Sequence, residues 1–173
     1  MNWYNLSIES QRTIARFLER SPEDFPLDSS LATMPLNEVK ETLLLAEEEL
    51  KDLTVLSLVS IFEQFLIEYL SELTDELSQK IDEPLSKETI EYACRNVERW
   101  YFKDILDLFK PIVGSQVVGD VKQIYNFRNW VAHGKNHKKK KKVTSVDPET
   151  AYERLSEFLN RLKLEVNNKQ RTK

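Results

Sequence analysis

Residues 55–70 read V-L-S-L-V-S-I-F-E-Q-F-L-I-E-Y-L, and this stretch decides the fold class. It lies in a segment, residues 36–83, that contains neither glycine nor proline. Before it, Val39 and Leu43 follow helical spacing, whereas residues 55–70 are apolar on nearly every side. A helix of that kind lies at the centre of a core or is shared between two subunits. We predict a long helical segment here, capped at or near Asn37, with a kink or break inside it.

The prolines divide the rest of the chain into further helical blocks. We expect helices over about residues 3–20, over 86–109 with a partial capping pattern at Ser86 and Thr89, over 112–132 with a stop at Gly134, and from Asp147-Pro148 onward. The predicted fold is all-α, an up-and-down bundle of four main helices plus an N-terminal accessory helix. The expected regions are an accessory helix and loop at 1–35, the helical bundle at 36–168 and a C-terminal tail at 169–173.

Composition narrows the class of protein. The chain has 173 residues, 40% of them hydrophobic, so it can bury a core. The single cysteine, Cys94, excludes an internal disulfide framework, and we interpret it as a buried structural thiol in a reducing compartment. No run approaches the roughly 20 apolar residues of a membrane span, and the N-terminus lacks a signal-peptide pattern. We therefore expect a cytoplasmic protein without a membrane partner.

Basic residues gather in one window although the net charge is −4. Residues 121–146 hold eight basic residues and no acidic one, which leaves 17 basic against 29 acidic residues in the rest of the chain. This asymmetry favours a patch that faces a polyanion, with RNA as the expected partner; a solvated loop is the alternative for the lysine run. The predicted RNA-binding residues are Lys135, Lys138, Lys139, Lys140, Lys141 and Lys142.

The most informative motif is R-N-W-V-A-H-G, Arg128 to Gly134. It resembles the motif of the HEPN superfamily (higher eukaryotes and prokaryotes nucleotide-binding), in which an arginine, usually followed by a polar residue, precedes a histidine by four to six positions near the end of a bundle helix. Residues 56–66 are similar to an earlier core helix of that family, and the resemblance extends over about residues 36–164. It is strongest to the prokaryotic ribonuclease-like branches, and it implies metal-independent RNA cleavage that leaves a 2′,3′-cyclic phosphate and a 5′-hydroxyl.

The residue types in the motif suit that chemistry. A histidine, whose unperturbed pKa of about 6.5 lies near working pH, can accept or return a proton. An arginine offers a planar fork of donors to phosphate oxygens. We predict catalytic roles for Arg128 as phosphate clamp and His133 as general base or acid, with Asn129 as a supporting hydrogen-bonding group. The alternative for Arg128 is an ordinary helix arginine in a salt bridge. The alternative for His133 is a histidine favoured by the C-terminal end of a helix.

Helix geometry separates the two main residues of the motif. Five residues at about 100° each place Arg128 and His133 about 140° apart around an ideal helix. They converge only if the helix unwinds before His133 or if a second subunit contributes its own pair. The resemblance implies a two-fold dimer with facing motifs, and we expect a homodimer. Glu63 is a candidate salt-bridge partner that orients Arg128.

Other chemistries find little support. The spacing of His133 and His137 is broken by Gly134 and has no neighbouring carboxylate or cysteine, so no metal site and no cofactor are predicted. The tyrosine, phenylalanine and tryptophan at positions 125, 127 and 130 are expected mainly in core or dimer packing, with base stacking as the alternative. The leading hypothesis is a ribonuclease of a toxin or defence module, with an antitoxin protein as a second partner. The alternatives are a catalytically inactive bundle that binds nucleotides, RNA or a partner protein, and a purely structural helical adaptor.

Overall fold

A computed structural model describes residues 2–21, 24, 29–135 and 143–171. Within these ranges there are seven α-helices, two short 3-10 helices and no strand, which confirms the all-α bundle. The α-helices are α1 (Asn2–Arg20), α2 (Leu36–Ser78), α3 (Pro84–Asn96), α4 (Phe102–Leu108), α5 (Lys110–Val113), α6 (Ser115–Ala132) and α8 (Pro148–Arg171). The predicted tail therefore begins inside α8, and the side chain of Cys94 lies outside the described part.

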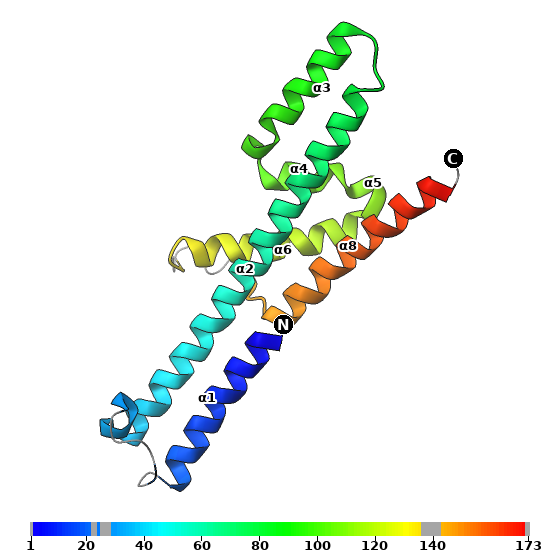
Figure 1. Cartoon of the computed structure of the whole chain (residues 1–173). Helices are drawn as coiled ribbons and strands as arrows, with labels where there is room; N and C mark the ends of the chain where they lie inside the picture. Colours follow the sequence, from blue (N-terminus) through cyan, green and yellow to red (C-terminus); the bar gives the residue numbers. More distant parts are fainter. Residues whose placement is uncertain (1, 22–23, 25–28, 136–142, 172–173) are drawn as a thin grey trace.

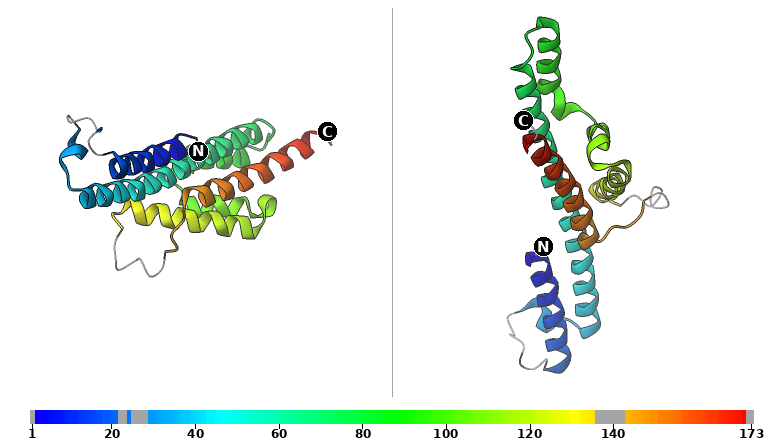
Figure 2. Two further views of the ribbon diagram at one scale, coloured as in Figure 1. Left: turned by 90° about the horizontal axis from the view of Figure 1, so that it is seen from below. Right: turned by 90° about the vertical axis from the view of Figure 1, so that its right-hand side faces the viewer.

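Helix α2 runs the length of the molecule, and the other long helices pack along it (Figure 1). Helix α1 lies along its N-terminal half, α3 along its C-terminal half, and α6 and α8 against its middle. The views in Figure 2 place α1 and α6 on different sides of α2. Of the kink or break predicted inside α2, the break is wrong: the helix is continuous from Leu36 to Ser78, because the segment has no residue that breaks a helix and neighbours support both halves. The predicted cap at Asn37 is wrong as well, since the helix follows Pro35 without a side-chain cap.

The core lies where α2, α4, α6 and α8 meet. Phe158 of α8 is fully buried, and its ring lies 5.1 Å from that of Phe62 on α2 and 5.5 Å from that of Phe109. Phe102 of α4 also packs against Phe62, with ring centroids 6.2 Å apart. The apolar positions predicted for α2 thus form the centre of the protein.

The block predicted as one helix over 86–109 is divided. Helix α3 ends at Asn96, a 3-10 turn follows at Val97–Arg99, and α4 begins at Phe102. Val97 and Phe102 are both 3% exposed, yet one continuous helix would place them about 140° apart. Breaking the helix between them lets both face the core.

The start of α3 also differs from the prediction. The helix begins at Pro84, two residues before the expected Ser86. The carboxylate of Glu83 accepts hydrogen bonds from the backbone N–H groups of Leu85 and Ser86, at 3.1 and 2.6 Å. An acidic side chain before the first turn therefore satisfies the free N–H groups that the predicted cap was meant to satisfy.

One helix of the described part, α2, contains a window long and apolar enough to cross a membrane by length and composition alone. This corrects the expectation that no run approaches such a span. The criterion is weak, because the core helix of a soluble protein meets it too. Only 33% of the window is buried inside the protein, so much of its apolar surface lies away from the core.

Asp147 caps α8, and its removal tests how that helix is anchored. Its carboxylate accepts hydrogen bonds from the Thr150 hydroxyl and backbone N–H, at 2.6 and 2.9 Å, and these bonds lower the pKa of Asp147 below its ordinary value. We expect Asp147→Ala to reduce the free energy of unfolding by about 1 kcal/mol at pH 7 and Asp147→Asn to cost less. A lowered folded-state pKa stabilises the fold above the unfolded-state value of about 4.

The difference between wild type and Asp147→Ala should therefore shrink as the pH falls through the lowered pKa, toward the smaller difference between Asp147→Asn and Asp147→Ala, because a protonated carboxyl still accepts hydrogen bonds. Urea unfolding followed by circular dichroism between pH 7 and pH 3 measures it. Equal losses for Ala and Asn, or a loss that does not change with pH, would contradict the capping role.

Candidate functional site

The motif stands at the C-terminal end of α6, where the helix stops in a defined way. Gly134 has φ +72°, as predicted for a left-handed stop. The Gly134 N–H donates to the Val131 carbonyl at 2.9 Å, and the Lys135 N–H donates to the Trp130 carbonyl at 3.0 Å. This Schellman pattern of bonds fixes the backbone on both sides of His133.

Arg128, Asn129 and His133 line one open groove of about 570 Å³. His133 is the C-cap residue of α6, with φ −94° and ψ 24°. The helix does not unwind before it, because the His133 N–H still donates to the Asn129 carbonyl at 3.0 Å. Arg128 and His133 nevertheless both line this groove of one chain. Among the described residues, no hydrogen bond joins Arg128 to His133. The two side chains share the lining of the groove without direct contact by a hydrogen bond.

The opposite side of the groove comes from the N-terminal end of α4. Four residues there line it, and Tyr125 of α6 completes it. Tyr101 is 82% exposed, and the Tyr125 ring packs 4.9 Å from that of Phe102. The contribution of α4 was not predicted, because nothing in the local sequence links it to a motif more than 20 residues later. The α4-side residues are Tyr101, Phe102, Lys103 and Asp104.

The Arg128 guanidinium is held from several sides. Its Nη2 lies 3.6 Å from a carboxylate oxygen of Glu63, its Nη1 donates to the Asn129 side-chain oxygen at 3.0 Å, and its Cζ lies 5.8 Å from the centre of the Tyr125 ring. The pairing with Glu63 agrees with the role predicted for that residue. Arg128 Nε is buried and makes no hydrogen bond within the described part of the chain. The side chain is therefore oriented before any ligand arrives, with part of its charge offset by Glu63.

The predicted basic patch is only partly described. Lys135 forms an ion pair with Asp52 of α2, whose side chain is 15% exposed. Lys122 pairs with Asp107, and hydrogen bonds from Lys110 and then Lys122 lower the pKa of that aspartate. The five lysines Lys138, Lys139, Lys140, Lys141 and Lys142 lie outside the described residues. Lys103 contributes a further cation to the groove.

The three aromatic residues around the motif have separate positions. Phe127 is buried, and the Trp130 ring lies 5.8 Å from it, partly buried against the core. Tyr125 also packs against the core, on Phe102, and lines the groove as well. Core packing, the main expectation, therefore holds for all three residues, and Tyr125 is the one of the three that lines the groove.

No family model, curated protein or solved structure matches the chain. The family resemblance therefore stays a prediction, and the function has to be argued from the groove itself. Nowhere in the described residues do three or more potential metal ligands gather. The groups that the groove offers to a ligand are a preoriented guanidinium, an amide, an imidazole, two tyrosine rings, the ammonium of Lys103 and the carboxylate of Asp104.

Two glycines of the same region allow a matched test of the helix stop. In Gly134→Ala a Cβ meets no atom within 4 Å, so the cost comes from the positive φ alone, and we expect a loss of about 1–2 kcal/mol. Gly119 lies inside α6 and also has open space around it. Gly119→Ala should stabilise the protein by about 0.5–1 kcal/mol, because alanine favours the helix. Thermal and urea unfolding of both variants measure the two effects; the same sign for both would contradict this account.

Proposed function

We propose that the groove at the end of α6 binds RNA and cuts it without a metal ion. The observation that carries this proposal is the convergence of Arg128, Asn129 and His133 on one open groove lined by tyrosines. A guanidinium suits the phosphate, an imidazole suits proton transfer near neutral pH, and aromatic rings suit unstacked bases. Tyr101, 82% exposed, and Tyr125 are the residues proposed to stack on bases.

The proposed reaction is attack of the RNA 2′-hydroxyl on the adjacent phosphorus. A base removes the proton of the 2′-hydroxyl while its oxygen bonds to phosphorus. The bond from phosphorus to the 5′-oxygen breaks, and that oxygen takes up a proton from an acid. The products are a 2′,3′-cyclic phosphate and a 5′-hydroxyl, and no oxidant, water or cofactor is consumed. Arg128 stabilises the charge on the phosphate oxygens, Asn129 holds the guanidinium, and His133 transfers a proton.

The reaction needs both a base and an acid, and among the described residues each groove has one histidine. We propose that a second copy faces this groove and that its own His133 supplies the other proton transfer. An isologous pair places two identical motifs across a two-fold axis. The proposed dimer interface is formed by the side of the molecule that carries α4 and α6, and it is part of the functional proposal.

A binding module without catalysis is the second candidate. The observation in its favour is the pairing of Arg128 with Glu63, since a guanidinium that is already paired has less charge to offer a phosphate. In that case the same groove holds a nucleotide, an RNA or a partner protein. The proposed toxin or defence role, with an antitoxin protein as partner, applies only if the protein cleaves RNA.

Incubation of the purified protein with RNA in the presence of EDTA tests the proposal. We expect wild type to cleave, and His133→Ala and Arg128→Ala each to lose about 100-fold or more of the rate, because each removes a group that acts in the transition state. Arg128→Lys keeps the charge but loses the planar fork, so it should rescue only part of the rate. The ends of the products should be 2′,3′-cyclic phosphate and 5′-hydroxyl.

Arg95→Ala is the matched control, because Arg95 is an exposed helix arginine on α3 that pairs with Glu88 and Glu91. It should cleave like wild type. Circular dichroism verifies that every variant is folded. If wild type binds RNA without cutting it, the binding module replaces the ribonuclease. If all variants cleave equally, the activity does not come from this groove.

A further inference from the structure

The α4 side of the groove carries an acidic side chain opposite the motif. Asp104 lines the groove together with Arg128 and His133. A carboxylate weakens the binding of a phosphate in the same groove, because like charges repel each other. A carboxylate is an acceptor of hydrogen bonds only. Asp104 therefore suits a part of the ligand that is not phosphate and that donates hydrogen bonds.

The protein itself does not use this carboxylate. Asp107, one turn further along α4, pairs with Lys110 and Lys122. Asp104 is exposed, and in the part of the chain that the structure describes it forms no ion pair or side-chain hydrogen bond. Lys103 beside it is exposed and equally unpaired within those residues. A ligand in the groove thus meets one free anion and one free cation from α4.

An aromatic ring adjoins these two charges. Tyr101 is 82% exposed, whereas Phe102, the next residue, is 3% exposed and anchors the segment in the core. The faces of exposed tyrosine rings can stack on the bases of single-stranded RNA. The groove measures about 570 Å³, within the range of about 300–1,000 Å³ that is typical of sites for small ligands. It therefore has room for one unstacked nucleotide.

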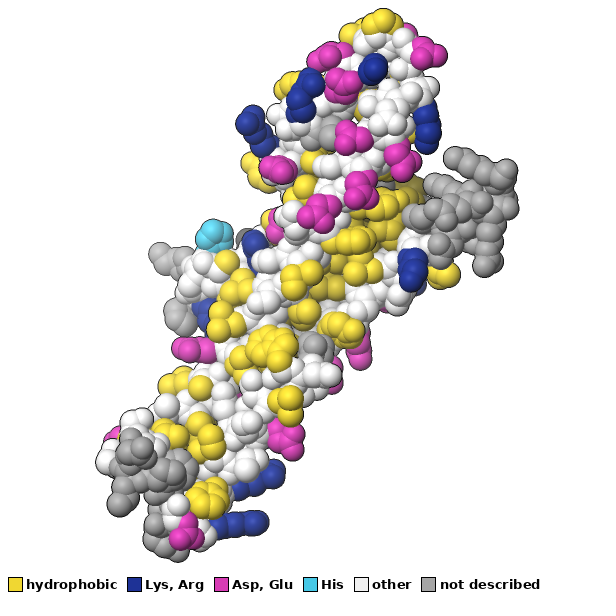
Figure 3. Space-filling model, viewed as in Figure 1, with side chains coloured by type: hydrophobic (Ala, Val, Ile, Leu, Met, Phe, Trp, Pro, Cys, Tyr) yellow, Lys and Arg dark blue, Asp and Glu magenta, His cyan; other side chains and the backbone are white. Residues whose placement is uncertain are grey.

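Charge over the wider surface does not select a ligand. Figure 3 shows acidic and basic side chains interspersed over the described part of one face of the molecule. A large area of one sign would attract any polyanion over a long range. Where both signs are mixed, the groups inside the groove have to supply the recognition.

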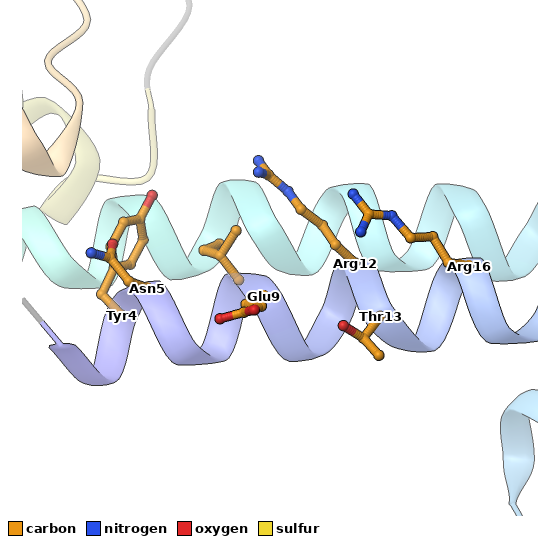
Figure 4. A pocket seen from close by; sticks show the side chains of 7 residues that line it. Tyr4, Asn5, Glu9, Arg12, Thr13 and Arg16 are labelled. Atoms are coloured by element: carbon orange, nitrogen blue, oxygen red, sulfur yellow. The ribbon is translucent and has the colours of Figure 1, made fainter.

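A pocket along α1 also carries cations, but it lacks these features. Arg12 and Arg16 extend to the same side of α1 (Figure 4), and Arg12 is paired with Glu47 of α2 at 2.9 Å. Every residue that lines this pocket belongs to α1. It contains no histidine, and no second element encloses a base there. The α1 pocket can attract phosphate, whereas the groove offers groups for both the phosphate and the base.

The four RNA bases differ in the donors that their pairing edges present. Guanine presents its N1–H and its 2-amino group side by side, with the O6 acceptor next to them. Adenine, cytosine and uracil each present one donor group on that edge. A carboxylate can accept two parallel N–H bonds, and an ammonium donates to an oxygen. Asp104 and Lys103 together therefore complement guanine better than any other RNA base.

We infer that the groove selects a guanine next to the RNA bond that is cut. Asp104 accepts hydrogen bonds from guanine N1 and N2, Lys103 donates to O6, and Tyr101 stacks on the ring. The adjacent phosphate then lies against Arg128 on the α6 side. The inference rests on the proposed function and names the base that the same site recognises. Asp104 and Lys103 determine specificity in this arrangement and transfer no proton.

Cleavage of a set of oligonucleotides tests the inference. Each is an oligouridine of about ten nucleotides with one central guanosine, adenosine, cytidine or inosine, incubated with the full chain and EDTA. Wild type should cut beside guanosine about tenfold or more faster than beside adenosine or cytidine, the discrimination expected of a two-bond pair. Inosine lacks the 2-amino group and should lose most of this advantage. In Asp104→Asn the preference should fall to about threefold or less, because an amide oxygen and an amide N–H replace the two acceptors.

Two variants serve as matched controls. Asp82→Asn changes an exposed acid in the turn between α2 and α3, outside the groove. Arg16→Gln removes a cation of the α1 pocket, which separates attraction of phosphate from recognition of the base. Both should keep the full preference for guanosine, and circular dichroism verifies the folding of all variants.

Calorimetric titration with GMP, AMP and CMP separates failure of the inference from failure of the proposed function. If wild type cuts RNA without preferring guanosine, if inosine serves as well as guanosine, or if Asp104→Asn keeps the preference, the inference is overturned and the ribonuclease proposal stands. If wild type cuts no RNA, the ribonuclease proposal fails. GMP that binds about tenfold tighter than AMP, with the difference lost in Asp104→Asn, would then still support the guanine site. Equal binding of the three nucleotides, or none, would overturn it.

Discussion

Phe62 of α2 and Phe158 of α8 pack edge to face, and this contact sets the positions of the helices around it. Phe158 also meets Phe109, and Phe62 also meets Phe102, so four aromatic rings from separate parts of the chain share one centre. Edge-to-face rings add specific geometry to the burial of large apolar area. Helices α4 and α8, and the segment that leads into α5, are all fixed relative to α2 by these rings.

The candidate site inherits its geometry from the same centre. Glu63, which orients Arg128, follows Phe62 directly, and Phe102, which starts the α4 side of the groove, packs on both Phe62 and Tyr125. The two sides of the groove therefore meet through the core and not through a flexible contact. Such support is what holds a guanidinium in one orientation before a phosphate binds.

The sequence was sufficient where a local physical rule decides the outcome. The apolar run at 55–70 gave the central helix, Gly134 gave the helix stop, and charge gave the pairing of Glu63 with Arg128. Features that depend on contacts between distant parts of the chain could not be predicted from the sequence. The break between Val97 and Phe102 depends on where the core lies, and the approach of Tyr101 to the motif depends on that break.

The length of α2 imposes a further condition on α1. The N-terminal half of α2 extends beyond the core formed with α6 and α8, and α1 packs along it (Figure 1). Helices α1 and α2 form a hairpin there. Apolar side chains of α2 such as Val39, which is 2% exposed, are buried in it. A helix that only covered this hairpin would need one apolar face. Ile8 and Leu18, 8% and 5% exposed, supply that face, so α1 covers the part of α2 that lies beyond the main core.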